Sequence, residues 1–335
     1  MSLFANLLAL PAHAADRMIV LVLALCLDAL IGDPPAFYAV VPHPVSLIGR
    51  AIALFDRRLN RETRGPRTRR ARGLLTLVVL GLAAMALGLA LSMLAAQFRL
   101  GWILEVLVVA VLVAQRSLFL HVRNVMLALQ REGLAAGRAA VSRIVGRDPD
   151  MLDGFGVARA AIESLAENFS DGVVAPVFFY AAAGLPGILL YKTVNTLDSM
   201  IGYRNSRYRD FGWASARCDD LLNLIPARLS GLLIVAASSF VPGGRPDRAL
   251  RTLWRDAGKH RSPNAGWPEA AMAGALDLAL AGPRHYRDIV VDDPWLGAGR
   301  ARAVPADIRR ALMLFAVACL IQLLLLAALA LLKPR

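Results

Sequence analysis

The chain has 335 residues, 57% of them hydrophobic, and a formal net charge of +13. This composition excludes an ordinary soluble domain and is typical of a polytopic membrane protein. Eight arginines and a single acid, Glu62, lie between Arg57 and Arg72, directly before an apolar segment. The positive-inside rule interprets this stretch as a cytoplasmic loop beside anionic headgroups. Nucleic-acid binding is not expected, because no aromatic residues interleave with the basic ones.

The N-terminus faintly resembles a signal peptide, but it lacks a positive n-region and has a short apolar core. We interpret it as an uncleaved segment. The three cysteines, Cys26, Cys218 and Cys319, are odd in number and have no CxxC spacing. They therefore predict neither a disulfide framework nor a zinc site.

Apolar segments long enough to cross a bilayer, which takes about 20 residues, recur along the chain. We expect full spans at residues 74–96, 100–120 and 311–332. Residues 18–31 form a shorter apolar segment that carries Asp28, and residues 222–241 form one that contains Pro226 and Arg228.

The apolar segment 173–190 is interrupted by Gly184, Pro186 and Gly187. Glycine and proline together permit a sharp reversal, and neither half is long enough to span. We therefore predict a re-entrant hairpin rather than a crossing. A hairpin keeps the polar motifs on either side of it on one side of the membrane.

Polar segments with helical period lie between the spans. Residues 43–59 alternate apolar and basic faces and are expected in the membrane interface, and residues 122–145 are amphipathic and basic. The polar region 242–307 should contain helices near 247–258 and 268–281. We predict an all-α polytopic integral membrane protein with a re-entrant segment, interfacial amphipathic helices and a single catalytic domain over residues 1–335.

Glu163, Glu167 and Asp171 recur every four residues, with Asn168 beside them. On a helix they form one acidic stripe at the membrane boundary. Neighbouring carboxylates repel one another unless a cation intervenes, and Mg²⁺ with phosphate oxygens is a natural solution. The alternative is a solvated helix face beside basic partners.

Lys192, Asn195 and Ser199 share a helix face, with Asp198 flanking it. A lysine and amides suit a phosphate or carboxylate ligand. Equally, the lysine would snorkel to the interface and the other residues would cap helices.

Further polar side chains cluster before residue 229 and after residue 258. One acid of the pair Asp219 and Asp220 is expected to meet a cation or an arginine, and the other to cap the following helix. Arg228 needs a partner in its apolar run. A helix N-terminus at Pro268, close to basic and titratable residues, is expected to form an anion site. The remaining binding candidates are His43, Arg204, Arg217, Asn223, Lys259, His260, Ser262 and Asn264.

Six ordered segments resemble the adenosylcobinamide-phosphate synthases of cobalamin biosynthesis, also called cobinamide synthases. They are GDPP at 32–35, HPVSLIGR at 43–50, ENFSDGVVAPVFF at 167–179, YKTVNTLDSMIGYRN at 191–205, FGWASARCDDLLNLIPARL at 211–229 and HRSPNAGWPEAAMAGAL at 260–276.

The resemblance implies an integral membrane enzyme that consumes ATP with Mg²⁺. It would join adenosylcobyric acid to an aminopropanol or its O-phosphate, giving adenosylcobinamide or its phosphate. The expected location is the inner membrane, with the active site facing the cytoplasm. The partners would be these substrates, the lipid bilayer and other enzymes of the corrinoid pathway.

We infer the residue roles from the chemistry, since the resemblance does not assign them. Acyl phosphate formation needs Mg²⁺, cations for the phosphates and a base for the amine. The expected catalytic residues are Glu167, Asp171, Lys192 and His260. Phosphates would meet Lys192, Arg204, Arg217 and Lys259, and Mg²⁺ would meet Glu163, Glu167, Asp171, Asp198, Asp219 and Asp220.

Two other classes remain open. An intramembrane prenyltransferase also places Asn- and Asp-rich helix segments at the cytoplasmic face to bind Mg²⁺-diphosphate. A transporter would use the break around Gly184 as its midplane site.

Overall fold

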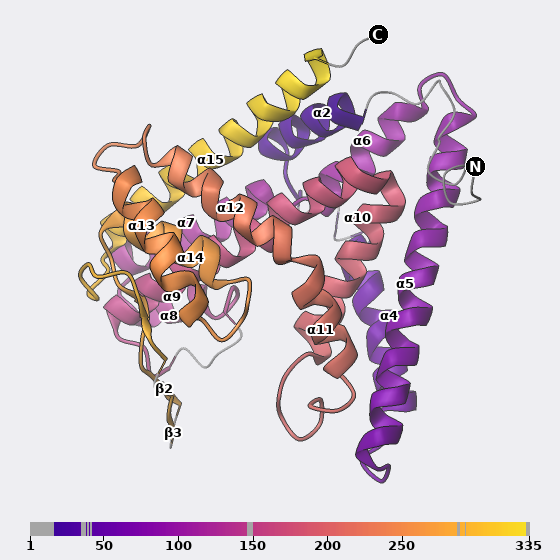
Figure 1. Cartoon of the computed structure of the whole chain (residues 1–335), viewed down its shortest axis with the longest axis horizontal. Helices are drawn as coiled ribbons and strands as arrows, with labels where there is room; N and C mark the ends of the chain where they lie inside the picture. The colour runs from indigo at the N-terminus through magenta and orange to yellow at the C-terminus, as the bar shows by residue number, and fades with distance from the viewer. Residues whose placement is uncertain are drawn as a thin grey trace. The chain divides into compact units, whose positions relative to one another are not determined.

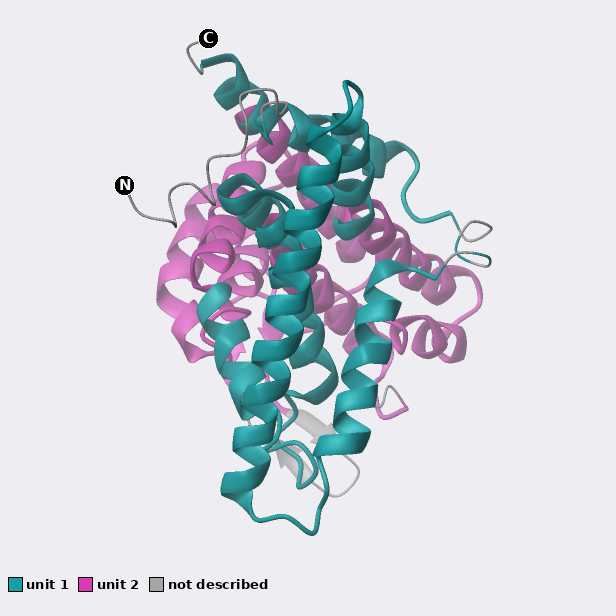
Figure 2. Ribbon diagram, turned by 90° about the vertical axis from the view of Figure 1, so that its right-hand side faces the viewer, with its two compact units in different colours: residues 1–114, 175–222, 326–335 teal, residues 115–174, 223–325 magenta. Residues whose placement is uncertain are grey.

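The structure is a computed structural model that describes residues 17–34, 38, 40, 42–145, 150–286, 289–291 and 293–332. The N-terminal segment interpreted as uncleaved lies outside the described residues. Helices make up most of the chain (Figure 1). The chain divides into two compact units, each assembled from separate stretches (Figure 2). Unit 1 holds residues 1–114, 175–222 and 326–335, and unit 2 holds residues 115–174 and 223–325. The prediction of a single catalytic domain over residues 1–335 requires that the two units work together, and it stays a prediction.

Unit 1 is built around two long helices that pack against each other, α5 and α10. Shorter helices pack on this pair, as Figure 1 shows for α4 and α11. Its helices are α2 (Arg17–Leu30), α4 (Pro44–Leu59), α5 (Pro66–Ala96), α6 (Gly101–Leu112), α10 (Ala175–Ile201) and α11 (Trp213–Leu222).

Glycines on one face of α5 let other backbones approach closely. A Cβ added to Gly73 would lie 1.8 Å from the carbonyl oxygen of Phe211, and one added to Gly88 would lie 2.5 Å from the nitrogen of Pro186. Other faces of α5 expose large apolar side chains such as Leu75 and Leu82. Small residues facing protein and large ones facing outward are typical of a membrane helix.

The chain folds back on itself within α10. Gly184 has φ 66° and ψ −150°, a conformation open essentially to glycine alone. The rings of Phe179 and Tyr191 stack with their centroids 5.0 Å apart. Twelve residues of straight helix would separate them by about 18 Å. The predicted sharp reversal at Gly184 is therefore present in unit 1.

Arg17 stabilises the end of the first arm of this reversal. Its guanidinium donates to the carbonyl oxygens of Ala182 at 3.0 Å and Ala181 at 3.5 Å. The last carbonyls of a helix have no partner within the helix, so a cation there satisfies them.

The stretch expected as an arginine-rich loop is mostly helical. α4 ends at Leu59 and α5 begins at Pro66, so Arg67, Arg70 and Arg72 occupy the first turns of α5. Pro66 is favoured at the first helical position because its missing N–H is not needed there.

Unit 2 packs helices around α14, which contacts α9, α12 and α13. Its elements are α7 (Gln115–Arg131), α8 (Leu134–Val141), α9 (Gly154–Phe169), the π-helical turn η1 (Ser170–Val174), α12 (Leu224–Ala237), α13 (Pro246–Asp256), the 3₁₀ turn η2 (Ala257–Lys259) and α14 (Gly266–Leu276). Most of α15 (Pro305–Leu332) also belongs to this unit.

Short strands that the sequence does not predict follow α14. β1 (Leu280–Ala281) pairs antiparallel with β4 (Trp295–Leu296), and β2 (Arg284–Tyr286) pairs antiparallel with β3 (Ile289–Val291). The predicted helix over 268–281 therefore starts at Gly266 and stops at Leu276. Asp277 follows in the left-handed conformation, which ends the helix.

Within the described residues, four helical stretches are long and apolar enough to cross a membrane: Pro66–Ala96, Gly101–Arg131, Gly154–Ile201 and Pro305–Leu332. A fifth is reached if Trp213–Leu222 and Leu224–Ala237 count as one span. The stretch Gly154–Ile201 contains the reversal at Gly184, so it is not one straight span. The stretch Gly101–Arg131 is interrupted at Val113, whose backbone is extended. The protein is an all-α polytopic membrane protein, as the sequence predicts.

Candidate functional site

Six residues predicted for the site lie close together in unit 1, on α10, on α11 and in the loop that joins them. We call them the α10–α11 cluster: Asn195, Asp198, Arg204, Arg217, Asp219 and Asp220. The Asn195 amide donates to Oδ1 of Asp219 at 3.3 Å, so the two helices meet through side chains that were singled out separately.

The second acid of α11 connects the rest of this cluster. Asp220 lies near enough to Asp198 for their carboxylates to repel each other. Arg217 reaches Oδ2 of Asp220 at 3.5 Å, and Arg204 also attracts this carboxylate. The cluster thus combines paired acids with two arginines and an amide. α12 begins at Leu224 and its N-cap position is Asn223, which makes no side-chain cap, so neither aspartate of the pair occupies the cap position predicted for one of them.

Lys192 and Ser199 flank the cluster on α10 in different surroundings. The Lys192 side chain is buried, with 8% of its surface exposed, so it does not snorkel. The Ser199 hydroxyl is exposed and donates to the carbonyl oxygen of Asn195 at 2.9 Å, a bond within its own helix. The structure therefore gives Ser199 a local contact.

The predicted acidic stripe in unit 2 is not uniform. Glu163 is buried and accepts the backbone N–H of Ala281 at 2.8 Å, whereas Glu167 is exposed. Asp171 lies in the π-helical turn that follows α9, whose wider winding shifts the register of the stripe. Ala281 has a positive φ of 56°, so Glu163 holds a residue in a conformation that alanine rarely adopts.

Asn168 and His43 make local contacts with backbone groups near them in the chain. The Asn168 amide donates to the carbonyl oxygen of Ser164 at 2.9 Å. His43 precedes α4, and its Nδ1 accepts the N–H of Val45 at 3.2 Å, with Asp33 3.7 Å from Nε2. His43 is thus the N-cap of α4 in unit 1.

The segment before α14 forms a compact turn in unit 2. His260 Nδ1 accepts the N–H of Ser262 at 3.0 Å, and Nε2 lies 3.8 Å from the buried carboxylate of Glu269. Nδ1 also lies 3.4 Å from the carbonyl oxygen of Ser262, so the contacts of the ring fit either tautomer. Ser262 Oγ accepts the N–H groups of Asn264 and Ala265, at 3.2 and 3.3 Å.

The predicted anion site at the start of α14 needs correction. The helix begins at Gly266, two residues earlier than expected, and Glu269 places a buried carboxylate in its first turn. Lys259 lies 2.6 Å from Asp256, so its charge is already partnered.

Asp256 is a buried hub that the sequence analysis did not single out. Burial raises its pKa, but hydrogen bonds from Arg255 and Lys259 and from the N–H of Gly297 outweigh burial and hold the pKa well below its usual range. The Gly297 contact, 2.8 Å long, ties the end of α13 to the residues that follow β4.

The structure also supplies partners for charges in apolar helices. The Arg228 guanidinium donates to the carbonyl of Leu224 at 2.6 Å and lies 4.4 Å from the centre of the Trp267 ring, so the partner expected for it is confirmed. Asn223 is fully buried beside α12. Glu105, an acid within the apolar α6 that the sequence analysis missed, accepts a hydrogen bond from Tyr180 in unit 1.

Three or more His, Cys, Asp or Glu side chains do not gather into a metal-holding group anywhere in the part of the chain that the structure describes. The predicted metal ligands divide between the units: Asp198, Asp219 and Asp220 in unit 1, and Glu163, Glu167 and Asp171 in unit 2. A single site that uses both sets stays a prediction.

These observations define a class: a helical multi-pass membrane protein with clustered acids, amides and cations on its apolar helices. Residues 21–315 match the family model described as CobD/Cbib protein, and the chain belongs to this family. It is 54% identical over 305 residues to the cobalamin biosynthesis protein CobD of Sinorhizobium sp, covering 90% of this chain and 94% of that one. It is 51% identical over 321 residues to the CobD of Rhizobium meliloti strain 1021, covering 95% and 98%.

The CobD of Rhodobacter capsulatus is 50% identical over 300 residues, covering 88% of this chain and 91% of that one. No solved structure matches the chain. The family membership predicted from the six motifs is confirmed, and the protein is an enzyme of cobalamin biosynthesis.

Proposed function

We propose that the protein catalyses ATP-dependent amide formation between the free side-chain carboxylate of adenosylcobyric acid and 1-amino-2-propanol or its O-phosphate. The product is adenosylcobinamide or its phosphate. The observation that carries this proposal is the α10–α11 cluster, which gathers paired acids and two arginines on membrane helices of a CobD/Cbib family member.

The reaction depends more on groups that neutralise the charge of the phosphates than on a strong nucleophile of the protein. A carboxylate resists attack by an amine, and phosphorylation by ATP makes it an acyl phosphate, which is a good electrophile. Arg204 and Arg217 would hold phosphate oxygens, since guanidinium groups match them geometrically. Lys192, buried on the same helix face as Asn195, would add a third cation.

The oxygen donors of the cluster fit Mg²⁺. This ion is usually held by one or two carboxylates together with waters and substrate phosphates, so the pair Asp198 and Asp220 suffices without a third acid. Bound there, Mg²⁺ would neutralise phosphate charge during transfer. Glu163 is a poorer candidate, because its carboxylate already accepts the N–H of Ala281.

The amine must lose a proton before or during its attack. A carboxylate or His260, whose ring contacts fit either tautomer, would accept that proton. We place the reaction at the cytoplasmic face of the inner membrane, because ATP is available there.

The test is reconstitution of purified protein with adenosylcobyric acid, ATP, Mg²⁺ and either amine. Mass spectrometry should show the amide product together with ATP consumption, and the Asp198→Asn and Asp220→Asn variants should lose it. Product formation without ATP would overturn the proposed mechanism. Failure to form the amide with either amine, together with transfer of a prenyl group or transport of the corrinoid, would favour one of the other two classes.

A further inference from the structure

α13 in unit 2 carries two stripes of apolar residues, and only one of them packs against protein. Ala249 lies against α14 and Leu253 lies against α12, so these side chains are buried. Leu250 and Trp254 are four residues apart and share a stripe next to the buried one. They are 41 and 66% exposed, although large apolar side chains usually pack inside.

The exposed apolar stripe of α13 continues onto α12. Trp254 packs edge-on against Trp267, with the ring centroids 5.3 Å apart. The guanidinium of Arg228, on α12, lies 4.4 Å from the centre of the Trp267 ring. Beside Arg228, α12 exposes three large apolar side chains on one helix face: Ile225, Leu229 and Leu232. The two helices therefore expose a contiguous apolar surface, which marks an interaction site.

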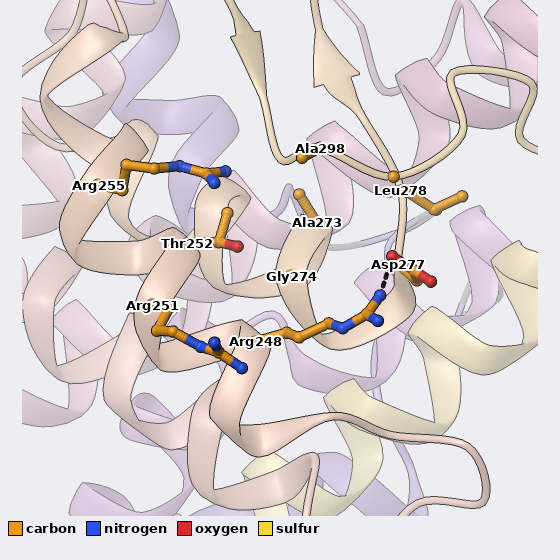
Figure 3. A pocket seen from close by; sticks show the side chains of 10 residues that line it. Arg248, Arg251, Thr252, Arg255, Ala273, Gly274, Asp277, Leu278 and Ala298 are labelled. Carbon is orange, nitrogen blue, oxygen red and sulfur yellow. Dashed lines mark hydrogen bonds and ion pairs between the residues drawn. The ribbon is translucent and has the colours of Figure 1, made fainter.

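Arginines border this apolar surface on α13. Arg251 and Arg255 directly follow Leu250 and Trp254 in the chain, so the basic stripe lies next to the exposed apolar one. Together with Arg248 they are exposed and line a pocket of about 240 Å³ between α13 and the end of α14 (Figure 3). A helix with an apolar stripe bordered by basic residues is typical of the membrane interface.

Two of these arginines keep capacity for an anion. Asp277 lies 2.7 Å from Arg248 and makes that end of the pocket unfavourable for negative charge. Arg251 pairs with Asp247, and both side chains are exposed, so the pair is weak and an anion can compete for Arg251. Arg255 pairs with an aspartate at 2.6 Å, but a guanidinium carries five N–H donors and keeps some for a ligand. The anion is therefore expected at Arg251 and Arg255.

Lipid is the occupant that fits both halves of this surface. α12 belongs to the pair of helices that could form a fifth membrane span, so the apolar surface that α13 extends is one expected to face the bilayer. Tryptophan is enriched where a membrane meets water, and arginines at that level attract anionic headgroups. A soluble anion would use the arginines and leave Leu250 and Trp254 in water.

We propose that α13 lies in the membrane interface and binds acidic phospholipids. The acyl chains contact Leu250 and Trp254 and continue along the exposed face of α12. The headgroup phosphate meets Arg251 and Arg255. A zwitterionic lipid brings its own cation to the phosphate, so an acidic headgroup such as phosphatidylglycerol is preferred. The proposal does not depend on the reaction proposed above.

The charge of the site is tested with two lipids that have the same acyl chains, dioleoyl phosphatidylglycerol and dioleoyl phosphatidylcholine. Native mass spectrometry of the full chain in detergent should show tighter binding of phosphatidylglycerol. Arg251→Gln combined with Arg255→Gln should weaken its binding by about fivefold for each arginine and leave phosphatidylcholine unchanged. Arg251→Lys combined with Arg255→Lys keeps the charge and should keep most of the preference. Arg131→Gln combined with Arg143→Gln removes two exposed arginines elsewhere in unit 2 and should change neither lipid.

The apolar half of the site is tested with a spin label at position 250, in a chain with Cys26, Cys218 and Cys319 replaced by serine or alanine. The protein is reconstituted in vesicles of equal parts phosphatidylcholine and phosphatidylglycerol. Oxygen, which concentrates among acyl chains, should relax this label more than a water-soluble nickel complex does. A label at the exposed position 143 should show the reverse.

Three results would overturn the proposal directly: equal binding of the two lipids by the wild type, unchanged phosphatidylglycerol binding in the double glutamine variant, or a label at position 250 that reports water. Displacement of phosphatidylglycerol by soluble glycerol phosphate would assign the arginines to a free phosphate instead. Spin–spin broadening at position 250 would assign the apolar surface to a second copy of the chain. Either of these results would also overturn the proposal.

Discussion

Glu163 and Glu167 lie four residues apart on α9 and have different surroundings. Glu163 is buried and holds the N–H of Ala281, a residue with positive φ, whereas Glu167 is exposed. The same side chain therefore fixes the backbone at one position and stays accessible to a ligand at the other. Residue type and spacing alone make the two look equivalent.

We expect Glu163→Ala to destabilise the protein by about 1–3 kcal/mol, because the N–H of Ala281 would stay buried without its acceptor. Glu163→Gln keeps an oxygen acceptor and should lose less. Glu167→Gln should leave the melting temperature unchanged and abolish amide formation. Thermal melts and the amide assay on all three variants check this. Full activity in Glu167→Gln would remove Glu167 from the chemistry, and an unchanged melt in Glu163→Ala would contradict the structural role.

Asp256 gives the protein an acid-sensitive contact. Its carboxylate pKa is held below the ordinary value, so the ionised form is favoured in the folded state. Its stabilisation is complete above the unfolded-state pKa of about 3.9 and is lost as pH falls towards the lower folded-state value. We therefore expect stability to be flat from neutral pH to about 5 with respect to this group, and to fall below about pH 4.

Asp256→Asn isolates that contribution. The variant should be less stable at pH 7 by about 1–3 kcal/mol, because Arg255, Lys259 and the N–H of Gly297 lose a charged acceptor. The difference from wild type should shrink as pH falls below about 4. Chemical denaturation of both proteins over a pH series measures it. A constant difference at every pH would show that Asp256 acts through packing rather than charge.

At the scale of elements, the backbone conformation at Gly184 determines where α10 reverses its direction. Gly184 allows the reversal, Arg17 satisfies the carbonyls of the first arm, and Phe179 stacks on Tyr191 across the bend. Gly88 of α5 lies against Pro186 of the bend. Gly88 comes fifteen residues after Gly73, so it lies about 22 Å further along the helix. α5 begins at its arginine-rich end, and the bend lies at this distance along it. The distance is smaller than the roughly 30 Å thickness of a hydrocarbon core, so the bend lies within the core.

Gly184→Ala should cost about 1–3 kcal/mol, since alanine is strained at φ 66° and ψ −150°. Gly154→Ala is the matched control: Gly154 has no positive φ, and an added Cβ there meets nothing within 4 Å. Melting temperatures of the two variants in detergent test this. A Gly184→Ala protein as stable as the control would show that the reversal does not depend on the glycine conformation.

The sequence predicted some elements well and missed others for physical reasons. Apolar length identified α5 and the last helix, and Gly184 with Pro186 identified the reversal, because these signals are local. The strands after α14 are two or three residues long, too short for a period to be visible. Glu105 was missed because its partner Tyr180 lies far away in the chain, and Asp256 was missed because neither its burial nor its contact with the N–H of Gly297 is visible in the sequence. Asn195 and Asp219 were expected to belong to one site, but the contact between their side chains was not predicted. Residue spacing gives the shared face of one helix and not the contacts between two helices.

At the scale of the molecule, contacts within unit 1 determine on which side of the membrane the loop after α10 lies. Asn60 donates to the carbonyl oxygen of Arg207 at 3.1 Å, and Arg69, which is buried, donates to the carbonyl oxygens of Ser206 and Arg207. Asp56 accepts from Arg207 at 2.7 Å. The loop carrying Arg204 therefore lies at the arginine-rich end of α5, which the positive-inside rule assigns to the cytoplasm.

We therefore expect positions 62 and 205 to have the same accessibility. In a chain with Cys26, Cys218 and Cys319 replaced by serine or alanine, a cysteine at either Glu62 or Asn205 should resist an impermeant thiol reagent applied to intact cells. Both should react after the membrane is opened. The control is a cysteine at Phe98, exposed beyond the other end of α5, which should react in intact cells. Labelling at 62 but not 205 would contradict the contacts of Asn60 and Arg69. Labelling of both in intact cells, with Phe98 protected, would keep those contacts and place the α10–α11 cluster on the outer side of the membrane, away from ATP.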